Sequence, residues 1–454
     1  EGRVSIRSAV RSAASLESNT VAGMGRDGEG KGGDGLVEAE SPPSPTHRGR
    51  VRRHSDAPRL PREIWALTAA GFIIAVGYGL VAPALPAFAR SFDVGVAAAS
   101  AVVSAFAFFR LVFAPVSGRL VNRFGELSTF VTGVIVVAVS SAACAFAGDY
   151  WQLLAFRAVG GVGSTMFTVS AASLLVRCAP PRLRGRAASL WATSFLLGNI
   201  AGPLLGGGLI VIDLRVPFLA YAGILVVAVV LALVMLRGRT GADPGTTRES
   251  ASEMAFRTAV RHRAFRAALL SNFGVGWVVF GVRIALVPLF VVEALGQDES
   301  WSGVAIAVFA AGNALMTMWA GRISDRYGRR PPILVGLGVT AVSTGLLGVM
   351  ASLPLFLVLS AIAGLGSGLM YPPTNAVVAD IVGNQARGGS VLAGFQMVAD
   401  IGAILGPVVG GLVAEAVGFE AAWAATGAVM ALGFAYWLRA PETAPAVSRA
   451  AGSG

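Results

Sequence analysis

The chain has 454 residues, of which 55% are hydrophobic and only 13% are charged. Because soluble domains average roughly 25% charged residues, this composition excludes an ordinary soluble protein and indicates one that is embedded in a lipid bilayer. The net charge of +11 comes from arginines spread over many loops. They do not form the aromatic-rich basic patch of a nucleic-acid interface, so no nucleic-acid partner is expected.

Residues 1–62 are expected to form a disordered cytoplasmic tail, because they are rich in Gly, Ser, Pro and charge. They also lack the apolar core of a cleaved signal peptide. Twelve apolar stretches follow, each close to or above the length of about 20 residues that a helix needs to cross a bilayer. They are 64–89, 96–117, 127–147, 150–176, 187–211, 216–236, 267–292, 303–321, 331–350, 353–380, 388–413 and 418–438. The sequence therefore predicts an all-α membrane protein with twelve transmembrane helices.

Arginines are distributed unequally between the two sides of these predicted helices. Loops and turns after even-numbered spans hold eighteen arginines, whereas the opposite side holds only Arg90 and Arg215. Loops rich in Lys and Arg usually stay in the cytoplasm. We therefore expect a plasma-membrane protein (in a bacterium, the inner membrane) with both termini cytoplasmic.

Residues 237–266 form a polar stretch at the midpoint of the membrane region. This linker divides the region into a six-helix bundle at 63–236 and another at 267–438, followed by a cytoplasmic tail at 439–454. From Glu253 onward the linker could form a short interfacial helix with a basic face. A solvated cytoplasmic linker is the other interpretation, and the sequence favours neither.

The two predicted bundles repeat a common pattern. "SGRLVNRFGEL", which contains Gly118, aligns with "AGRISDRYGRR", which contains Gly321 (321 − 118 = 203). "GGVGS" around Gly161 and "AGLGS" around Gly364 have the same offset (364 − 161 = 203). The sequence therefore predicts two pseudo-symmetric six-helix bundles.

Several motifs resemble those of the major facilitator superfamily. "GRISDRYGRR", from Gly321 to Arg330, is similar to the superfamily's G-x-x-x-D-R-x-G-R-R loop. "GYGLVAPALP" in the first span, "RAVGGVG" in the fourth and "GNIAGPLLGG" in the fifth resemble motifs of its twelve-helix drug:proton antiporters. The resemblance covers about residues 64–438. It implies two bundles that rock about a central site and open it alternately to each side of the membrane.

The resemblance gives conformational roles to residues of the first span and of the two loop motifs. They are Gly77, Pro83, Pro86, Gly118, Asn122, Arg123 and Gly125 in the first half, and Gly321, Asp325, Arg326, Gly328, Arg329 and Arg330 in the second. Asp325 is expected to pair with a neighbouring arginine or to cap a helix, as part of a cytoplasmic latch. Asn122 is uncharged at the matching position, so the first latch is expected to be weaker, or to be merely a structural turn.

Two glycine–proline motifs lie about half a chain apart, in the fifth and eleventh spans. Their residues are Gly198, Gly202, Pro203 and Gly206 in the first half and Gly402, Gly406, Pro407 and Gly410 in the second. At about 100° per residue, glycines four residues apart share one helix face, where a neighbouring helix can approach closely. We expect either a tight contact across which the halves rock or close packing alone.

Ionisable side chains inside a bilayer are costly and are therefore candidates for function. Asp400 lies near the middle of the eleventh span, on the face that carries Gln396 and away from the glycine face. It is expected to face a cavity and to bind a proton or a cationic substrate. A structural salt bridge is the alternative.

Three arginines also lie within predicted spans: Arg110, Arg157 and Arg283. Arg110 could pair with Asp400 or bind an anionic group, and Arg283 is a weaker candidate of the same kind. By resemblance, Arg157 matches a family arginine that is associated with proton coupling. It could instead snorkel to the membrane surface or pair with Asp149.

Other polar and aromatic residues of the spans could line a cavity or join helices by hydrogen bonds. They are Asn199, Asn272, Asn313, Asn375, Trp277 and Tyr371. The two cysteines and three histidines form no metal-ligand cluster, so no metal and no cofactor are expected. The sequence has no phosphate-binding loop for ATP and no catalytic constellation, so we do not expect an enzyme.

We therefore expect a monomeric secondary transporter that exports small amphipathic or drug-like molecules in exchange for protons. A proton-coupled importer of a small metabolite, with the same fold, is the first alternative. A receptor or sensor is the second, and it is disfavoured because the sequence contains no soluble input or output domain.

Overall fold

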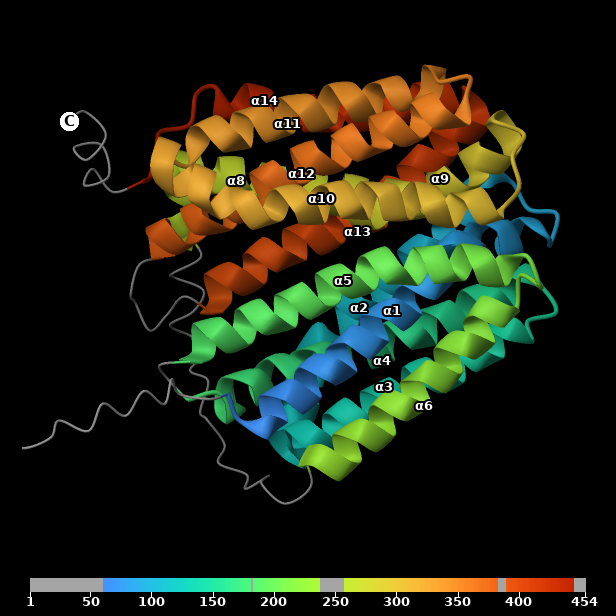
Figure 1. The fold of residues 1–454 in the computed structure, drawn as a ribbon, viewed down its shortest axis with the longest axis horizontal. Coiled ribbons are helices and arrows are strands. Elements are labelled where there is room, and N and C mark those ends of the chain that lie inside the picture. Colours follow the sequence, from blue (N-terminus) through green and yellow to red (C-terminus); the bar gives the residue numbers. More distant parts are fainter. Residues whose placement is uncertain (1–59, 181–182, 237–256, 383–388, 445–454) are drawn as a thin grey trace, which may run out of the picture. The chain divides into compact units, whose positions relative to one another are not determined.

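The computed structural model describes residues 60–180, 183–236, 257–382 and 389–444, which are almost entirely helical. Eleven helical segments are long and apolar enough to cross a membrane. The helices of the first half, blue to green in Figure 1, are α1 (Arg62–Arg90), α2 (Val96–Phe124), α3 (Glu126–Ala145), α4 (Tyr150–Cys178), α5 (Arg184–Ile210) and α6 (Val216–Leu236). The expected N-terminal tail lies outside the described residues.

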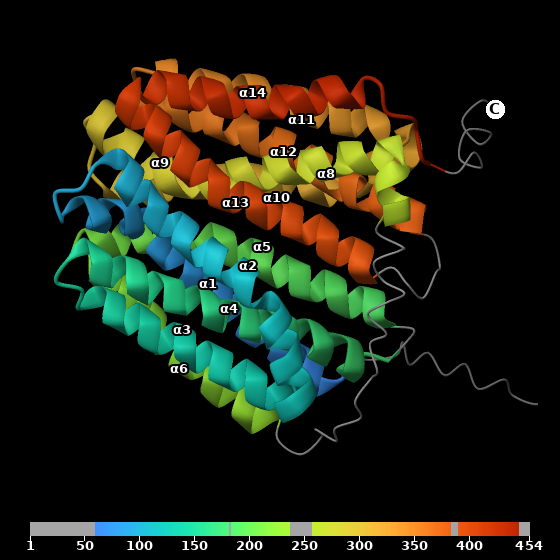
Figure 2. The same cartoon turned by 180° about the vertical axis from the view of Figure 1, so that it is seen from behind.

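The second half, yellow to red in Figures 1 and 2, begins with a span of four consecutive segments. They are α8 (Arg263–Val275), η2 (Gly276–Val282), α9 (Arg283–Leu289) and η3 (Phe290–Ala294). The others are α10 (Ser300–Tyr327), α11 (Arg330–Leu346), η4 (Leu347–Val349), α12 (Leu353–Val382), α13 (Gly389–Ala416) and α14 (Phe419–Trp437). Residues 257–261 are helical too, whereas the start of the expected interfacial helix lies outside the described residues.

Every predicted span is helical at or near its expected position, which confirms the all-α fold. The predicted span that is not among the eleven is α14, a 19-residue helix that includes Glu420, Trp423 and Tyr436. It nevertheless packs against α11 and α8. The indole of Trp437 at its end donates a hydrogen bond to Ser271 Oγ at 2.7 Å.

We call the end of the bundle at which α1 begins the arginine-rich end, and the end at which α1 finishes the arginine-poor end.

The seventh span departs from the regular α-helix that its sequence predicts. Two π-helical segments, η2 and η3, lie on either side of α9. Gly276 in η2 lies so close to the backbone of Ala399 that a Cβ would have no room. π-Helical turns frequently occur at functional sites, and these two flank Arg283.

Equivalent glycine contacts occur in the two halves. Gly161 of α4 lies against the carbonyl oxygen of Phe106 in α2. Gly364 of α12 lies against that of Phe309 in α10, and both residues follow their counterparts by 203 positions. The halves therefore pack α2 on α4 and α10 on α12 through the same close approach of backbones.

The glycine motifs of the fifth and eleventh spans pack within each half. A Cβ on Gly202 would lie 2.7 Å from Gly79 Cα of α1, and one on Gly406 would lie 2.8 Å from the Trp277 carbonyl oxygen of η2. The other motif glycines face α1 in the first half and the segments of the seventh span in the second, and so do the Cδ atoms of the two prolines. They are Gly198, Gly206, Gly402 and Gly410, with Pro203 and Pro407. The interpretation that these glycines form the contact across which the halves rock is therefore wrong.

The next glycine along each helix makes the contact between the halves instead. Gly207 of α5 lies against Ser300 of α10, and Gly411 of α13 lies against Ser100 of α2. One residue turns a helix by about 100°, which carries these two glycines off the face that packs on α1 or η2. The prediction assigned the wrong face of each helix to the contact between the halves, because the motif glycines and the glycine that follows them face different helices.

An ion pair joins equivalent helices in both halves, with its charges exchanged. Glu126 at the start of α3 lies 2.5 Å (Oε1–Nη1) from Arg177 of α4. At the positions 203 residues later, Arg329 lies 3.3 Å (Nε–Oδ2) from Asp380 of α12. The repeat therefore preserves the contact and reverses its polarity.

We predict that Gly202→Ala destabilises the purified protein by about 1–3 kcal/mol, because a methyl group would overpack the crossing of α1 and α5. Gly208→Ala is the matched control on the same helix, since a Cβ there meets nothing within 4 Å. Thermal unfolding in detergent measures both changes. Equal melting temperatures for the two variants would contradict this account of the crossing.

A second prediction concerns the exchanged ion pair. Glu126→Arg and Arg177→Asp should each lower the melting temperature by several degrees, because each leaves two like charges together. The double variant should recover most of the loss, since the second half already carries this polarity at the equivalent contact. Independent, additive losses in the double variant would show that the two contacts are not equivalent.

Candidate functional site

An ion pair between Arg110 of α2 and Asp400 of α13 joins the two halves. Arg110 Nη2 lies 2.5 Å from Asp400 Oδ1, and the side chains are 33% and 15% exposed. Asp400 is 11 residues from the start of α13 and 16 from its end. Among the described residues, no other carboxylate lies so far from both ends of its helix. The motif glycines and Asp400 lie on different faces of α13, as the helix phase predicts.

The residues expected to line a cavity fall into two groups. Gln396 and Tyr371 are exposed, and Asn199 is half-buried without a hydrogen bond to the described residues. Asn272 and Asn313 instead join helices: Asn272 donates to the Phe395 carbonyl at 2.6 Å, and Asn313 donates to Ser367 Oγ at 3.1 Å. Asn375 donates to the carbonyl of Tyr371 on its own helix, and Trp277 is buried against the Phe273 ring.

Two buried arginines lie over equivalent phenylalanines. The guanidinium of Arg157 is 4.5 Å from the ring centre of Phe106, and that of Arg283 is 3.8 Å from that of Phe309. Ser360 takes the place of Arg157 in the second half and lies 3.5 Å from Arg283 Nη1. The Nε atoms of both arginines lack a hydrogen-bond partner among the described residues. The same positive charge is thus supplied by α4 in one half and by α9 in the other.

The pairing of Arg157 with Asp149, which the sequence left open, is not made. Asp149 caps α4 instead, because its carboxylate accepts a hydrogen bond from the Gln152 amide at 2.9 Å. Arg157 is only 5% exposed, so it does not snorkel to the surface either. It is a buried cation that faces an aromatic ring.

The second loop motif forms a network within its own half. Arg329 lies 2.6 Å from Asp325, one helical turn earlier, and also contacts Asp380. Burial lowers the pKa of Arg329, but the hydrogen bonds to the two carboxylates outweigh this effect and raise it above its ordinary value. Asp325 therefore pairs with a neighbouring arginine, Arg329, which is one of the two roles expected for it.

Glu442, which sequence reasoning missed, ties the segment after α14 to this loop. Its carboxylate accepts hydrogen bonds from the backbone amides of Arg329 and Arg330, at 2.8 and 3.0 Å, and from those of Thr443 and Ala444. Burial raises the pKa of Glu442, but these four amides lower it below its ordinary value. No motif marked this residue, because its partners are backbone groups.

The first loop motif keeps the turn but not the charged network. Gly125 and Gly328 both have positive φ angles, 82° and 90°, that a side chain would strain. Arg123 lies over Phe124 and Arg326 over Tyr327, each 5.3 Å from the ring centre. Asn122 is exposed and forms no hydrogen bond with the described residues. Gly118 and Gly321 have open space where a Cβ would lie.

The two halves meet toward the arginine-poor end. Within the membrane-spanning parts of the described helices, the polar contacts between the halves are Arg90–Glu293, Ala97–Glu415, Ser104–Ile404 and Arg110–Asp400. The last of these lies furthest from that end. The halves are therefore in direct polar contact at the arginine-poor end of the described structure.

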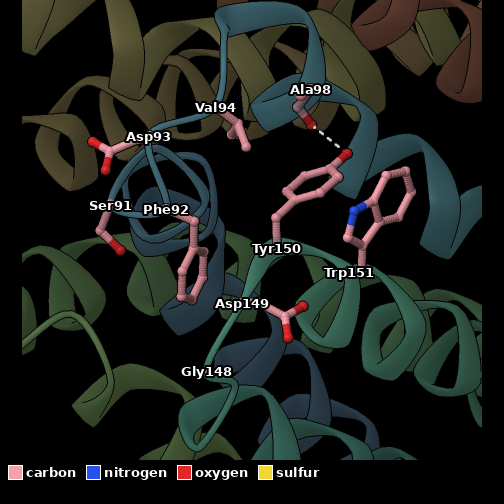
Figure 3. Close-up of a pocket in the computed structure, with 9 residues that line it drawn as sticks. All are labelled: Ser91, Phe92, Asp93, Val94, Ala98, Gly148, Asp149, Tyr150 and Trp151. Carbon is pink, nitrogen blue, oxygen red and sulfur yellow. Dashed lines mark hydrogen bonds between the residues drawn. The ribbon is translucent and has the colours of Figure 1, made fainter.

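A surface hollow of about 690 Å³ lies at the arginine-poor end, away from the ion pair. It is lined by Ser91, Phe92, Asp93, Val94, Ala98, Gly148, Asp149, Tyr150 and Trp151 (Figure 3). The Tyr150 hydroxyl donates to the carbonyl of Ala98 at 3.0 Å and fixes one wall. None of the predicted site residues lines it.

Comparison with known proteins identifies the family to which this chain belongs. The profile of the Major Facilitator Superfamily matches residues 67–298 and 268–453. Multidrug resistance protein 1 of Bacillus subtilis is 25% identical over 353 residues, covering 75% of this chain and 87% of that protein. The class E tetracycline resistance protein of Escherichia coli is 27% identical over 350 residues, covering 74% and 84%.

Two solved transporter structures share this fold. A bacterial homolog of the human lysosomal transporter Spinster, inward-facing and unoccupied, has a TM-score of 0.70 at 18% identity and covers 83% of this chain and 95% of that one. A D-xylose–proton symporter has a TM-score of 0.67 at 15% identity and covers 84% and 98%. The chain therefore belongs to the Major Facilitator Superfamily and is a multi-pass membrane transporter of small molecules, not an enzyme.

Proposed function

We propose that this transporter exports small amphipathic or drug-like molecules in exchange for protons, with Asp400 as the proton-binding carboxylate. The observation that carries the proposal is the Arg110–Asp400 ion pair between the halves. The multidrug and tetracycline resistance proteins among its relatives support export as the direction. The excess of arginines at one end supports an orientation in the plasma membrane with both termini cytoplasmic.

The ion pair couples protonation to the arrangement of the halves. A deprotonated Asp400 binds Arg110 and holds α13 against α2. When a proton neutralises Asp400, the attraction is lost, and the charge on Arg110 no longer favours the closed state. Charge pairs away from bulk water are worth more than surface pairs, and removing one partner of a buried pair is costly. One protonation event can therefore shift the balance between two conformations.

The same pair indicates how a solute could be exchanged for a proton. A cationic group of the solute would compete with protons for Asp400, so the two would bind in turn and not together. Competition at one site is what exchange requires. Gln396, one turn from Asp400 and exposed, is placed to contact the same solute.

We predict that Asp400→Asn abolishes proton-driven efflux and raises dye or antibiotic accumulation to that of cells without the protein. Accumulation of a panel of dyes and antibiotics is measured with and without the protein, and with and without a protonophore. Asp298→Asn is the matched control, because it makes the same chemical change in an exposed loop acid. Normal protonophore-sensitive efflux by Asp400→Asn would dismiss the assignment, and unchanged accumulation across the panel would count against drug export.

A proton-coupled importer of a small acidic metabolite is the second candidate. One observation favours it: Arg110, Arg157 and Arg283 outnumber the single deep carboxylate of the described spans. An anionic solute on Arg110 would release Asp400, which would then take up a proton. Solute and proton would bind together, as in cotransport.

The pH dependence of solute binding separates the two candidates. For exchange, we predict that the affinity of the purified protein for a transported dye falls as the pH is lowered, by up to about tenfold per pH unit, because one proton competes with the dye for Asp400. Binding is measured by fluorescence in detergent. Affinity that rises with acidity would instead support cotransport.

A further inference from the structure

Two contacts between the halves occupy equivalent places in the repeat. On one side α13 crosses α2, where Gly411 lies against Ser100. On the other side α5 crosses α10, where Gly207 lies against Ser300 and Gly303. Gly411 follows Gly207 by 204 residues, and Gly303 follows Ser100 by 203. We call these contacts the α2–α13 seam and the α5–α10 seam.

The α2–α13 seam carries three polar contacts in a row, which we call the polar ladder. From the arginine-poor end inward they are the Ala97 amide to Glu415 (2.8 Å), Ser104 Oγ to the Ile404 carbonyl (2.6 Å) and Arg110 to Asp400 (2.5 Å). Residue numbers rise along α2 and fall along α13, as antiparallel helices require. The ladder therefore runs from the surface to the middle of the bundle.

The α5–α10 seam has no such ladder. In the described residues, no hydrogen bond or ion pair joins α5 to α10. The positions equivalent to Ser104 and Glu415 are Ala307 and Val211, which have no polar side chain. Asn313, equivalent to Arg110, bonds to Ser367 within its own half. The two seams share their glycine contacts and differ in their chemistry.

The outermost rung is a helix cap supplied by the opposite half. The N-cap residue of α2 is Gly95, and it has no side chain with which to cap the helix. The carboxylate of Glu415 in α13 accepts a hydrogen bond from the backbone amide of Ala97 instead. A Cβ on Gly95 would lie 2.8 Å from Glu415 Cδ, so the glycine leaves room for the carboxylate. A negative charge at a helix N-terminus is also favourable, which adds to the strength of this rung.

We infer that the α2–α13 seam is the releasable gate of the transporter, and that Ser104 and Glu415 are positioning residues that hold it closed together with Asp400. Opening at the arginine-poor end requires these three contacts to break, together with the Arg90–Glu293 ion pair between α1 and η3. The α5–α10 seam separates without losing a polar contact. The role of Asp400 in this scheme rests on the proposed function, whereas the roles of Ser104 and Glu415 do not.

The experiment measures the two seams separately in lipid nanodiscs, without any solute. Spin labels replace exposed residues at the arginine-poor end, in a background with Cys144→Ala and Cys178→Ser. Trp151 with Val417 reports the α2–α13 side, and Val211 with Trp301 reports the α5–α10 side. Distance distributions from double electron–electron resonance give the ratio of open to closed molecules.

Ser104→Ala and Glu415→Met should each raise that ratio about two- to tenfold on both label pairs, the effect of losing one hydrogen bond. Glu415→Gln keeps an acceptor oxygen and should have a smaller effect. Ser300→Ala is the matched control on the α5–α10 seam and should leave the ratio unchanged, because its hydroxyl makes no hydrogen bond among the described residues.

An unchanged ratio in both Ser104→Ala and Glu415→Met, or an equal shift in Ser300→Ala, would overturn the inference. Failure of the proposed function looks different. In that case Asp400→Asn would leave efflux intact, while Glu415→Met would still open the gate.

Discussion

Opposite charges near the middle of a membrane protein stabilise the state in which they meet and destabilise every state in which they are apart. Arg110 and Asp400 are such a pair, and they belong to different halves of the bundle. Asp400 is the more buried partner, with 15% of its side chain exposed against 33% for Arg110. Under the proposed function, the balance between conformations would depend on the ionisation of this one carboxylate.

The repeat preserves the close approaches between helices more strictly than it preserves charge. Gly161 and Gly364 meet equivalent carbonyl oxygens, because a side chain at either position would push two helices apart. The ion pair at the start of α3 and α11 tolerates exchange of its charges, since either polarity gives the same attraction. A helix crossing limits the size of the side chains that meet there, whereas an ion pair requires only that its two charges have opposite signs. The two halves therefore share their helix crossings and differ in their polar contacts.

The sequence predicted the helices, the repeat and the depth of Asp400, because hydrophobic length and helix phase are local properties. It also offered Arg110 as a partner for Asp400, since few charges lie so deep. It failed where a residue's neighbour depends on how helices are rotated in the bundle. The motif glycines were linked to the wrong interface, and Gly207 and Gly411, one residue further on, were overlooked.

Other features had no signal in the sequence. Glu442 and Glu415 bind backbone amides, which every residue except proline has, so no partner motif identifies them. Gly276 of the π-helical segment η2 lies against the backbone of Ala399, a tertiary contact that the sequence does not reveal. The repeat did not predict the position of Arg283 over Phe309, because the equivalent cation in the first half, Arg157, comes from a different helix.

The surface hollow in Figure 3 is built from the connection between α1 and α2, Ala98 of α2, and residues 148–151 at and just before the start of α4, all in the first half. Asp93, Val94 and Ala98 in its wall adjoin Gly95 and Ala97, which contact Glu415 of the opposite half. A molecule seated in the hollow would therefore lie beside the α2–α13 seam.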